Sequence, residues 1–563
     1  MEPTVISEQR DGGEPQTRHL QKAEDADLLP LYPLLRSVEE VEGPVEATVT
    51  GRIPAWLSGS LLRNGPGRFE VGPDCYNHWF DGMALMHRFR VHDGRVSYSS
   101  RFLRSDSYLR NEARQRIVVS EFGTVAFPDP CKTLFDHFFA CFRVPEMSDN
   151  NLVSIVEYQQ DFYAMSETPS LRRIDPVTLQ TKEKVNWSDL VAVSMATAHP
   201  HSDPDGTSYN LGNSFGKGGP SYNIIRIPAS KSGRQPDGRP ALMEGATIVA
   251  SIPASSRLKP SYYHSFGMTE NYIVFLEMPL RMDLVRLMSL PFRHKATVEQ
   301  AMVYEPRRGT RIHVVNKHTG QPVPVEFRTR PLVCLHHVNA YEEEEETEEP
   351  GEGRHCLARR LVVDLCVQEG SGAYSAYHLV NMRQTGAALR KIYQNGPRYG
   401  LQRLVLPLPE AASTPEGTPK KTKSKVWVEP EALLSDEELS RTGGFELPAV
   451  NYARHNGRRY RFTYGCGFRH LVGESLLKVD VEARVIAAEW RLPGYFPSEP
   501  VFVESPGAEH EDSGLLLSVV VSPLPDLPAF LLILDAATFA EVARAEVRVA
   551  IPYGFHGKYA PGI

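Results

Sequence analysis

Short strand-like segments separated by turns recur along most of this 563-residue chain. In the recurrent pattern an apolar run ends at Asp or Asn, a few turn residues follow, and a second strand-like run begins. Four copies of this pattern stand at Ile174-Asp175-Pro176, Val315-Asn316-Lys317, Val479-Asp480 and Leu534-Asp535-Ala536. A two-residue turn, Asp93-Gly94, also separates residues 88–92 from residues 95–98, which predicts a β-hairpin.

The strand–turn–strand units are not interleaved with regular helical patterns, so a parallel α/β sheet is not expected. The pattern favours an all-β fold in which antiparallel blades surround one axis, a β-propeller. Two or three β-sandwiches in series are the alternative, because the chain has no WD or kelch signature. In a propeller one end of each innermost strand lies near the axis. Residues that are distant in sequence could therefore share a site there.

Residues 1–28 are polar and are expected to form a flexible segment, with residues 29–563 as a single domain. An acidic run at 342–356 and a run rich in Pro, Thr, Ser and Lys at 409–425 are expected to be loop insertions. Two other segments have helical spacing of apolar residues. They are 131–143, with Phe135, Phe138, Phe139 and Phe142, and 280–290, with Leu280, Leu284, Leu287 and Met288. Either stripe could pack in a core or lie at a membrane interface.

The composition excludes several classes of protein. Hydrophobic residues make up 41% of the chain and its net charge is −7, so neither general disorder nor a nucleic-acid partner is expected. Seven cysteines without a C-x-x-C pair disfavour a disulfide framework or a zinc ribbon and fit a reducing compartment. No apolar stretch reaches the length of about 18 residues needed to span a bilayer. The acidic first 30 residues resemble neither a mitochondrial transit peptide nor a secretory signal.

Histidines are the candidate metal ligands, and the chain has 19 of them. Four stand in separate motifs: Ala198-His199-Pro200-His201, His264-Ser265-Phe266-Gly267, Leu335-His336-His337 and Gly554-Phe555-His556-Gly557. No two of these motifs share a helix or turn, so only the fold could bring them to one metal. A single histidine is more often structural than a ligand, and the residues alone do not select these four.

Several further motifs occur in order along the chain: Gly51-Arg52-Ile53-Pro54-Ala55-Trp56-Leu57, Leu62-Arg63-Asn64-Gly65-Pro66-Gly67, His78-Trp79-Phe80-Asp81-Gly82-Met83, Pro128-Asp129-Pro130-Cys131, Ala196-Thr197-Ala198-His199-Pro200-His201, Lys259-Pro260-Ser261-Tyr262 and Tyr495-Phe496-Pro497-Ser498-Glu499-Pro500. From about residue 35 onward, the chain resembles the carotenoid cleavage oxygenase family, which includes the retinoid isomerase of the retinal pigment epithelium. That resemblance implies a seven-bladed β-propeller with a helical and loop cap over an axial metal site.

The resemblance also implies the metal and its ligands. One ferrous iron, Fe(2+), would be held by His199, His264, His336 and His556, while His201 and His337 match no ligand position. Neutral imidazole suits Fe(II), and four such ligands leave two octahedral positions open. The family further implies three glutamates that hold ligand imidazoles. They pair Glu167 with His264, Glu446 with His336 and Glu499 with His556.

Two departures flank this expected centre. Pro169 stands where many relatives carry Asn, and Ser194-Met195 replaces a common Asn-Gly. Both leave the expected ligands intact, so they bear on substrate range more than on activity.

The resemblance implies an iron-dependent dioxygenase that uses O₂ to split one double bond of a carotenoid. Tyr464-Gly465-Cys466-Gly467-Phe468-Arg469-His470 and Pro552-Tyr553-Gly554-Phe555-His556 resemble the branch that cleaves asymmetrically at 9′,10′. Xanthophylls, whose rings are hydroxylated, are expected substrates because that cut lies away from the centre of the molecule. Symmetric cleavage to retinal, O₂-independent retinoid isomerohydrolase activity and a propeller that only binds ligands are the alternatives. Alkene oxidation has no leaving group to protonate, so no catalytic acid or base is expected.

The expected partners and location also follow from the resemblance. Segments 131–143 and 274–292 would contact a membrane surface from which carotenoid is drawn, and no obligate protein partner is evident. The family implies a mitochondrial location, with the cytosol as the alternative because no transit peptide is visible.

Overall fold

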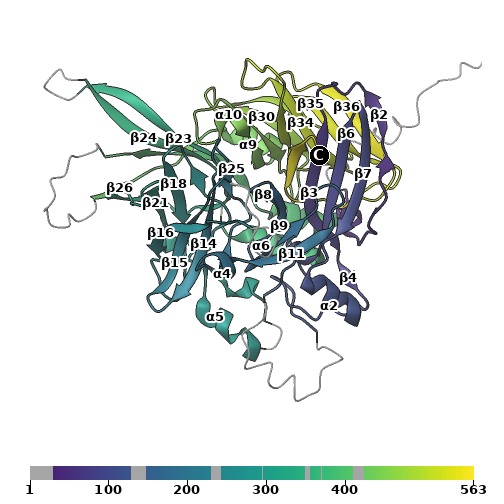
Figure 1. Ribbon diagram of the computed structural model, residues 1–563, viewed down its shortest axis with the longest axis horizontal. Coiled ribbons are helices and arrows are strands. Elements are labelled where there is room, and N and C mark those ends of the chain that lie inside the picture. The colour runs from purple at the N-terminus through teal and green to yellow at the C-terminus, as the bar shows by residue number, and fades with distance from the viewer. Residues whose placement is uncertain are drawn as a thin grey trace, which may run out of the picture.

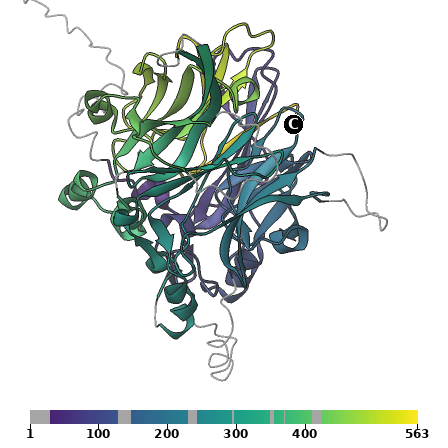
Figure 2. The ribbon, with the colours of Figure 1, turned by 90° about the vertical axis from the view of Figure 1, so that its left-hand side faces the viewer.

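The fold is a seven-bladed β-propeller, each blade a sheet of four to six strands. The computed structural model describes residues 29–127, 147–229, 242–293, 296–348, 355–368, 370–409 and 424–563. In Figures 1 and 2 the sheets follow one another around the molecule, so that the N-terminal strands lie beside the C-terminal ones. The all-β propeller expected from the turn pattern is therefore confirmed, and the series of sandwiches is not found.

The blades are numbered here in chain order, and within each the strands are given in order of pairing. Blade one contains β1 (Val45–Glu46), β7 (Arg95–Phe102), β6 (Met83–His92), β3 (Gly59–Arg68) and β37 (Gly557–Pro561). Blade two contains β11 (Thr181–Asn186), β10 (Ser170–Ile174), β9 (Asp161–Met165) and β8 (Ser154–Tyr158). Blade three contains β12 (Met195–Ala196), β14 (Ser208–Gly216), β15 (Gly219–Ile227) and β16 (Thr247–Pro253), with β13 (His201–Ser202) also paired to β14.

The remaining blades follow the same plan. Blade four contains β17 (Gly267–Met268), β18 (Tyr272–Glu277), β21 (Thr310–Asn316), β22 (Val325–Thr329) and β26 (Ser424–Trp427). Blade five contains β23 (Val333–Glu348), β24 (His355–Gln368), β25 (Tyr399–Pro407) and β27 (Glu431–Ala432). Blade six contains β28 (Glu446–Ala449), β29 (Phe462–Gly467), β30 (Ser475–Asp480) and β31 (Val485–Trp490). Blade seven contains β2 (Thr48–Gly51), β36 (Glu541–Val547), β35 (Ala529–Asp535), β34 (Gly514–Val521) and β32 (Phe496–Pro497), with β33 (Val501–Glu504) also paired to β34.

The ring is closed by strands from both ends of the described chain. The C-terminal β37 pairs with β3 in blade one, and the N-terminal β2 pairs with β36 in blade seven. These exchanges join the first and last blades, because each of the two sheets contains strands from both ends. Closure also buries the faces of the first and last blades against each other, which an open stack of sheets would leave exposed.

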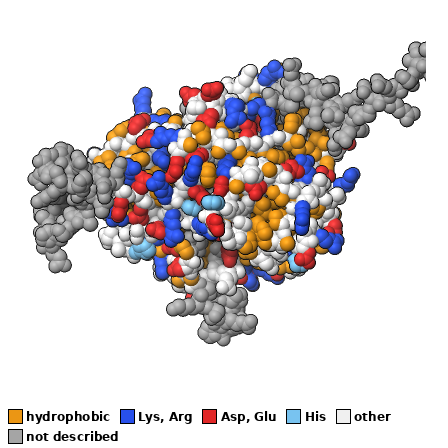
Figure 3. Space-filling model, turned by 90° about the horizontal axis from the view of Figure 1, so that it is seen from above, with side chains coloured by type: hydrophobic (Ala, Val, Ile, Leu, Met, Phe, Trp, Pro, Cys, Tyr) orange, Lys and Arg blue, Asp and Glu red, His pale blue; other side chains and the backbone are white. Residues whose placement is uncertain are grey.

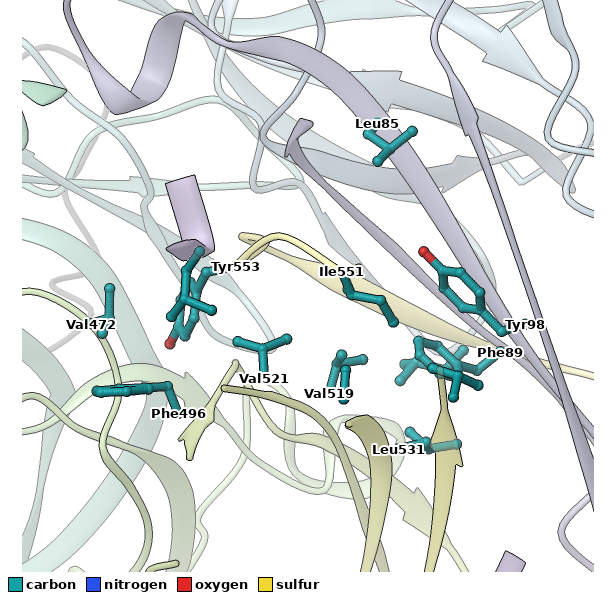
Figure 4. Close-up of a cluster of buried hydrophobic side chains, with 14 of the residues drawn as sticks. Leu85, Phe89, Tyr98, Val472, Phe496, Val519, Val521, Leu531, Ile551 and Tyr553 are labelled. Carbon is teal, nitrogen blue, oxygen red and sulfur yellow. The ribbon is translucent and has the colours of Figure 1, made fainter. Parts of the chain in front are cut away.

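Apolar side chains fill the interfaces between neighbouring blades. Along β34 alternate residues face opposite sides: Leu516 and Val520 pack toward blade six, whereas Leu517 and Val519 pack toward blade one. Figure 4 shows the interface of blades one and seven, where Phe89 and Tyr98 face Val519, Leu531 and neighbouring apolar side chains. Both faces of β34 are buried, so its sequence is a nearly continuous apolar run.

The recurrent turn of the sequence has one geometry in four blades. Asn316, Asp480 and Asp535 end a strand and Asp175 directly follows one, and the side-chain oxygen of each accepts a hydrogen bond from the backbone N–H three residues later. The residue four positions later has a positive φ in every case: Leu179 56°, Gly320 72°, Arg484 60° and Phe539 61°. The side-chain oxygen replaces backbone partners that the reversing chain loses. The hairpin at Asp93-Gly94 is also confirmed, with His92 paired to Arg95.

Helices and two small two-stranded sheets lie outside the blades, and one of these sheets pairs β4 (Glu70–Val71) with β5 (Asp74–Cys75). The helices are α2 (Asp106–Arg114), α4 (Trp187–Leu190), α5 (Leu284–Ser289), α6 (Gly372–Ala376), α7 (Leu379–Met382), α8 (Gly386–Gln394), α9 (Asp436–Thr442) and α10 (Tyr452–His455). Short 3-10 turns include η3 (Trp79–Asp81) and η4 (Leu290–Phe292), and β19 (Leu280–Met282) pairs with β20 (Met302–Tyr304). The prediction of a helix over 280–290 is therefore wrong for residues 280–283. Leu280 is buried in β19, and the helix begins only after Asp283, whose side chain caps it.

The acidic segment is also corrected by the structure. Residues 342–348 belong to β23 rather than to a loop, and β23 and β24 form a long hairpin that projects from the body in Figure 1. Cross-strand ion pairs, Glu342 with Arg359 at 3.0 Å and Glu343 with Arg360 at 2.8 Å, offset the repulsion between neighbouring glutamates. Residues 1–28, the whole of 131–143 and nearly all of 409–425 lie outside the described residues.

In the described part of the chain, no helix is long and apolar enough to cross a membrane. Figure 3 shows acidic and basic side chains interspersed over the upper face, beside a patch of hydrophobic side chains.

Candidate metal centre

Seven side chains, one from each blade, surround the site. Four are the histidines of the separate motifs and three are glutamates. In order from blade one to blade seven they are His556, Glu167, His199, His264, His336, Glu446 and Glu499. His336 and Glu446 lie in β23 and β28, and the other five lie within three residues of a strand of their own blade. The radial fold therefore gathers residues that are up to 389 positions apart, from Glu167 to His556.

The four histidine rings converge. One ligating atom from each of His199, His264, His336 and His556 can be chosen so that all four lie within 4.8 Å of one another. Nε2 of His199 lies 3.0 Å from Nε2 of His264. Two nitrogens, each about 2.1 Å from a metal and at right angles, would be about 3.0 Å apart, so this separation suits a shared ion.

Three of the imidazoles are held from behind by carboxylates. Nδ1 of His264 hydrogen-bonds Oε1 of Glu167, Nδ1 of His336 lies 2.5 Å from Oε2 of Glu446, and Nδ1 of His556 lies 2.7 Å from Oε1 of Glu499. Each carboxylate accepts the Nδ1 hydrogen and so leaves Nε2 with a free lone pair. Among the described residues His199 has no carboxylate partner.

Burial governs the charge of these groups. Burial, reinforced by the neighbouring histidines, holds the pKa of His199 well below its usual value, so this ring is neutral near pH 7. Burial also lowers the pKa of His336, but the charge and hydrogen bond of Glu446 outweigh it and raise the value overall. For Glu499, burial alone would raise the pKa, yet His556, Arg63 and the Gly557 amide lower it. Glu499 is therefore an anion at neutral pH.

The two neighbouring histidines do not join the cluster. His201 contacts the Phe266 carbonyl at 3.0 Å through Nε2 and the Tyr452 hydroxyl at 3.1 Å through Nδ1. Nδ1 of His337 lies 2.7 Å from Oγ of Ser265. Each ring therefore makes a hydrogen bond that links its own blade to blade four.

Two residues near the centre were not predicted as functional from the sequence. Arg63 donates to Oε2 and to the carbonyl oxygen of Glu499, both at 3.1 Å. Tyr262 donates its hydroxyl hydrogen to Oε2 of Glu167 at 2.8 Å. Each lies within a motif that resembled the family, but nothing local in those motifs indicates a partner more than 90 residues away.

An apolar wall adjoins the histidine cluster. Leu335 and Phe555 directly precede clustered histidines, and Tyr262 stands two residues before His264. Their side chains pack against residues of η3 and α6. The Phe80 ring contacts Phe555 at 5.5 Å between centroids, and the Tyr374 ring contacts Tyr262 at 5.9 Å. On this side the cluster is therefore bordered by aromatic rings.

The donor set fits a divalent transition metal. Nε2 of His336 is buried and has no hydrogen-bond partner among the described residues, which is costly unless that nitrogen binds something. Four imidazole nitrogens without a thiolate or a coordinating carboxylate suit iron, copper, nickel or zinc.

The comparisons with known proteins give the family. The family described as "Retinal pigment epithelial membrane protein" matches residues 35–561. The chain belongs to this family. The resemblance inferred from the motifs is therefore confirmed.

Individual relatives match most of this chain. A protein of Mustela putorius furo named "Carotenoid-cleaving dioxygenase, mitochondrial" is 46% identical over 541 residues, which cover 94% of this chain and 96% of that protein. The Homo sapiens protein of the same name is 45% identical over 545 residues and is covered to 90%.

Solved structures share the fold. Cobalt-substituted Synechocystis ACO has a TM-score of 0.71 at 23% identity, over 94% of this chain and 98% of that one. A chimera of ACO and RPE65 has a TM-score of 0.70 at 22% identity, with the same coverage. At these identities the likeness bears on the fold alone.

Proposed function

We propose that this chain is an iron(II)-dependent dioxygenase that cleaves one double bond of a carotenoid. The observation that carries the proposal is the convergence of His199, His264, His336 and His556 at one point, three of them braced by carboxylates. The relatives named carotenoid-cleaving dioxygenase support the substrate class. In the net reaction O₂ is consumed, the alkene bond breaks, and one oxygen atom enters each of two carbonyl products.

The histidines, the glutamates and the aromatic wall have separate roles in this proposal. The four imidazoles would hold Fe(2+), which when bound supplies the open coordination positions for activating O₂. Glu167, Glu446 and Glu499 fix the tautomer and direction of three of the rings. The aromatic wall of Phe80, Tyr262 and its neighbours would position the polyene and exclude water.

The cleaved bond is proposed to be the asymmetric 9′,10′ bond, and hydroxylated xanthophylls are proposed substrates. The support is the resemblance of the motifs around Tyr464 and Pro552 to the asymmetric branch. An eccentric cut leaves the distant ring of the substrate away from the metal, so a ring hydroxyl there need not be buried beside it.

A membrane surface is the proposed source of substrate. Within segment 274–292, residues 274–277 lie buried in β18, so only its later part could contact lipid. Val285, Met288 and Phe292 of α5 and η4 are large apolar side chains exposed by 54%, 65% and 66%. Such a short apolar face suits insertion into the interface rather than a crossing.

Liposome flotation tests this surface. Replacing Val285, Met288 and Phe292 together by Ser should reduce the lipid-bound fraction. Phe215, Trp427 and Val485 are also exposed apolar residues but lie on blades three, four and six, so their triple Ser variant is the matched control. Equal flotation of both variants would refute the proposal that Val285, Met288 and Phe292 contact the membrane.

We propose a mitochondrial location, because the relatives carry that word in their names. A fluorescent tag at the C-terminus, which leaves residue 1 free, tests it. Cytosolic fluorescence would contradict the proposal.

The activity is tested with purified protein, β-carotene or a hydroxylated carotenoid, and ¹⁸O₂. The expected products are an apocarotenal and an ionone-type ketone, each with one labelled oxygen. Retinal as the single product would indicate symmetric cleavage, and ester cleavage without O₂ would indicate an isomerohydrolase. An iron content far below one per chain after anaerobic, iron-replete purification would instead favour a propeller that only binds ligands.

A further inference from the structure

A small cavity lies between blades one and seven, behind the Glu499–His556 pair. It has room of about 10 Å³ for water-sized atoms and is lined by His87, Arg63, Ser498 and Tyr553, among others. That volume is close to the minimum that one water molecule needs. Nε2 of His87 and Oγ of Ser498 are both buried, and neither has a hydrogen-bond partner among the described residues.

His87 lies on a row of paired residues that ends beside a clustered histidine. In blade one His87 of β6 pairs directly with Arg63 of β3, and Arg63 pairs with Gly557 of β37. Directly paired residues place their side chains on the same face of a sheet. Gly557 follows His556, so the row leads from the cavity to this candidate metal ligand.

Arg63 connects the row with blade seven. Its guanidinium donates to Glu499 Oε2 at 3.1 Å and to the Phe555 carbonyl at 2.6 Å. It therefore holds both the carboxylate that orients His556 and the backbone just before that ring. Ser498, which lines the cavity from blade seven, immediately precedes Glu499.

We propose that His87 is a positioning residue for His556 and acts through one water molecule that bridges His87 Nε2 and Ser498 Oγ. The bridge joins blade one to blade seven beside Arg63 and so fixes the backbone on which Glu499 stands. This inference rests on the proposed iron site.

Hydrogen-bond chemistry supports a water rather than an ion. Nδ1 of His87 lies 2.8 Å from the Tyr98 hydroxyl, which leaves Nε2 for the cavity in either tautomer. Burial and the charge of Arg63 hold the pKa of His87 at about 3, so the ring is neutral. A neutral imidazole and a hydroxyl can each donate to or accept from water, whereas two buried polar atoms without partners would be costly. The guanidinium beside them disfavours a cation.

The test measures iron(II) affinity by chelator competition in Ser498→Ala, His87→Leu and the double variant. Each single change should weaken iron binding about three- to tenfold, less than the roughly 10–100-fold typical of a direct partner of a ligand. Since both act through one water, the double variant should bind no more weakly than the poorer single variant. His87→Gln, which keeps a polar atom near the position of Nε2, should retain more affinity than His87→Leu.

Two controls separate the outcomes. His313→Leu removes an imidazole from β21 of blade four and should leave iron affinity unchanged. A high-resolution crystal structure of the wild-type protein should show water between His87 and Ser498. Absence of that water, wild-type affinity in folded Ser498→Ala, or multiplying effects in the double variant would overturn the inference. If the wild-type protein binds no iron at all, the proposed function fails, and the crystal structure still decides the water bridge.

Discussion

The hydroxyl of Tyr262 lies 2.8 Å from Oε2 of Glu167. The other oxygen of this carboxylate accepts the Nδ1 hydrogen of His264, so a single glutamate fixes two side chains that stand two residues apart. Glu167 belongs to blade two and His264 to blade four, and their contact passes across blade three. The direction of the His264 ring thus depends on a carboxylate that is itself oriented by Tyr262.

Tyr262→Phe is expected to lower iron affinity and activity about three- to tenfold, because Glu167 loses the hydrogen bond that directs it. Tyr263→Phe is the matched control: the Tyr263 hydroxyl is buried without a partner among the described residues, so its loss should change neither quantity. Iron per chain and initial rates of carotenoid cleavage measure both. Equal behaviour of the two variants would contradict the role of Tyr262.

His336 and His337 give a sharper comparison. His336→Ala should abolish iron binding and activity, whereas His337→Ala should leave iron in place, because the His337 ring contacts Ser265 instead of the cluster. Metal analysis after purification under iron-replete, anaerobic conditions gives the answer. Equal iron contents would show that the ligand assignment is wrong.

The same pair shows what the sequence could predict. Successive side chains of a strand point to opposite faces, so of two adjacent histidines only one could face the axis. The sequence alone could not tell which, since the pairing of β23 with β24 shifts register between Cys334 and His337 and again before Asn339. The family resemblance supplied that choice.

The hairpins were predictable because their signal is local. Asp175 and Asp535 mark their turns with a side chain that bonds the next few backbone groups. Seven blades were not predictable from pattern, because the number depends on closure by β37 with β3 and β2 with β36, pairings between opposite ends of the chain. The strand at 342–348 was missed for a similar reason: its stabilising arginines, Arg359 and Arg360, lie on the returning strand.

Glu446→Gln is predicted to lower iron affinity or activity about 10–100-fold. Gln can still accept a hydrogen bond from Nδ1 of His336, but it has no charge to strengthen that bond. Glu474→Gln is the control, because Glu474 holds Nδ1 of His470 at 2.5 Å in the same manner but outside the cluster. Chelator competition on both variants measures the difference, and similar losses in the two would mean that the effect is one of general stability.

The last prediction concerns pH and the buried Asp81 of η3. Burial raises the pKa of this carboxyl to about 7, although the Gly123 amide and the Thr124 hydroxyl donate to it and the His378 imidazole lies nearby. Asp81 is ordinarily ionised above about pH 4 in an unfolded chain. Between about pH 4 and 7 the folded protein therefore binds one more proton than the unfolded one, and the contribution of Asp81 to stability falls as pH rises. Asp81→Asn cannot ionise and should lack that fall. The free energy of unfolding of the variant minus that of the wild type should therefore increase by up to about 4 kcal/mol from pH 4 to pH 8. Urea denaturation at several pH values measures this gap. A constant gap between wild type and Asp81→Asn would refute the buried, protonated carboxyl.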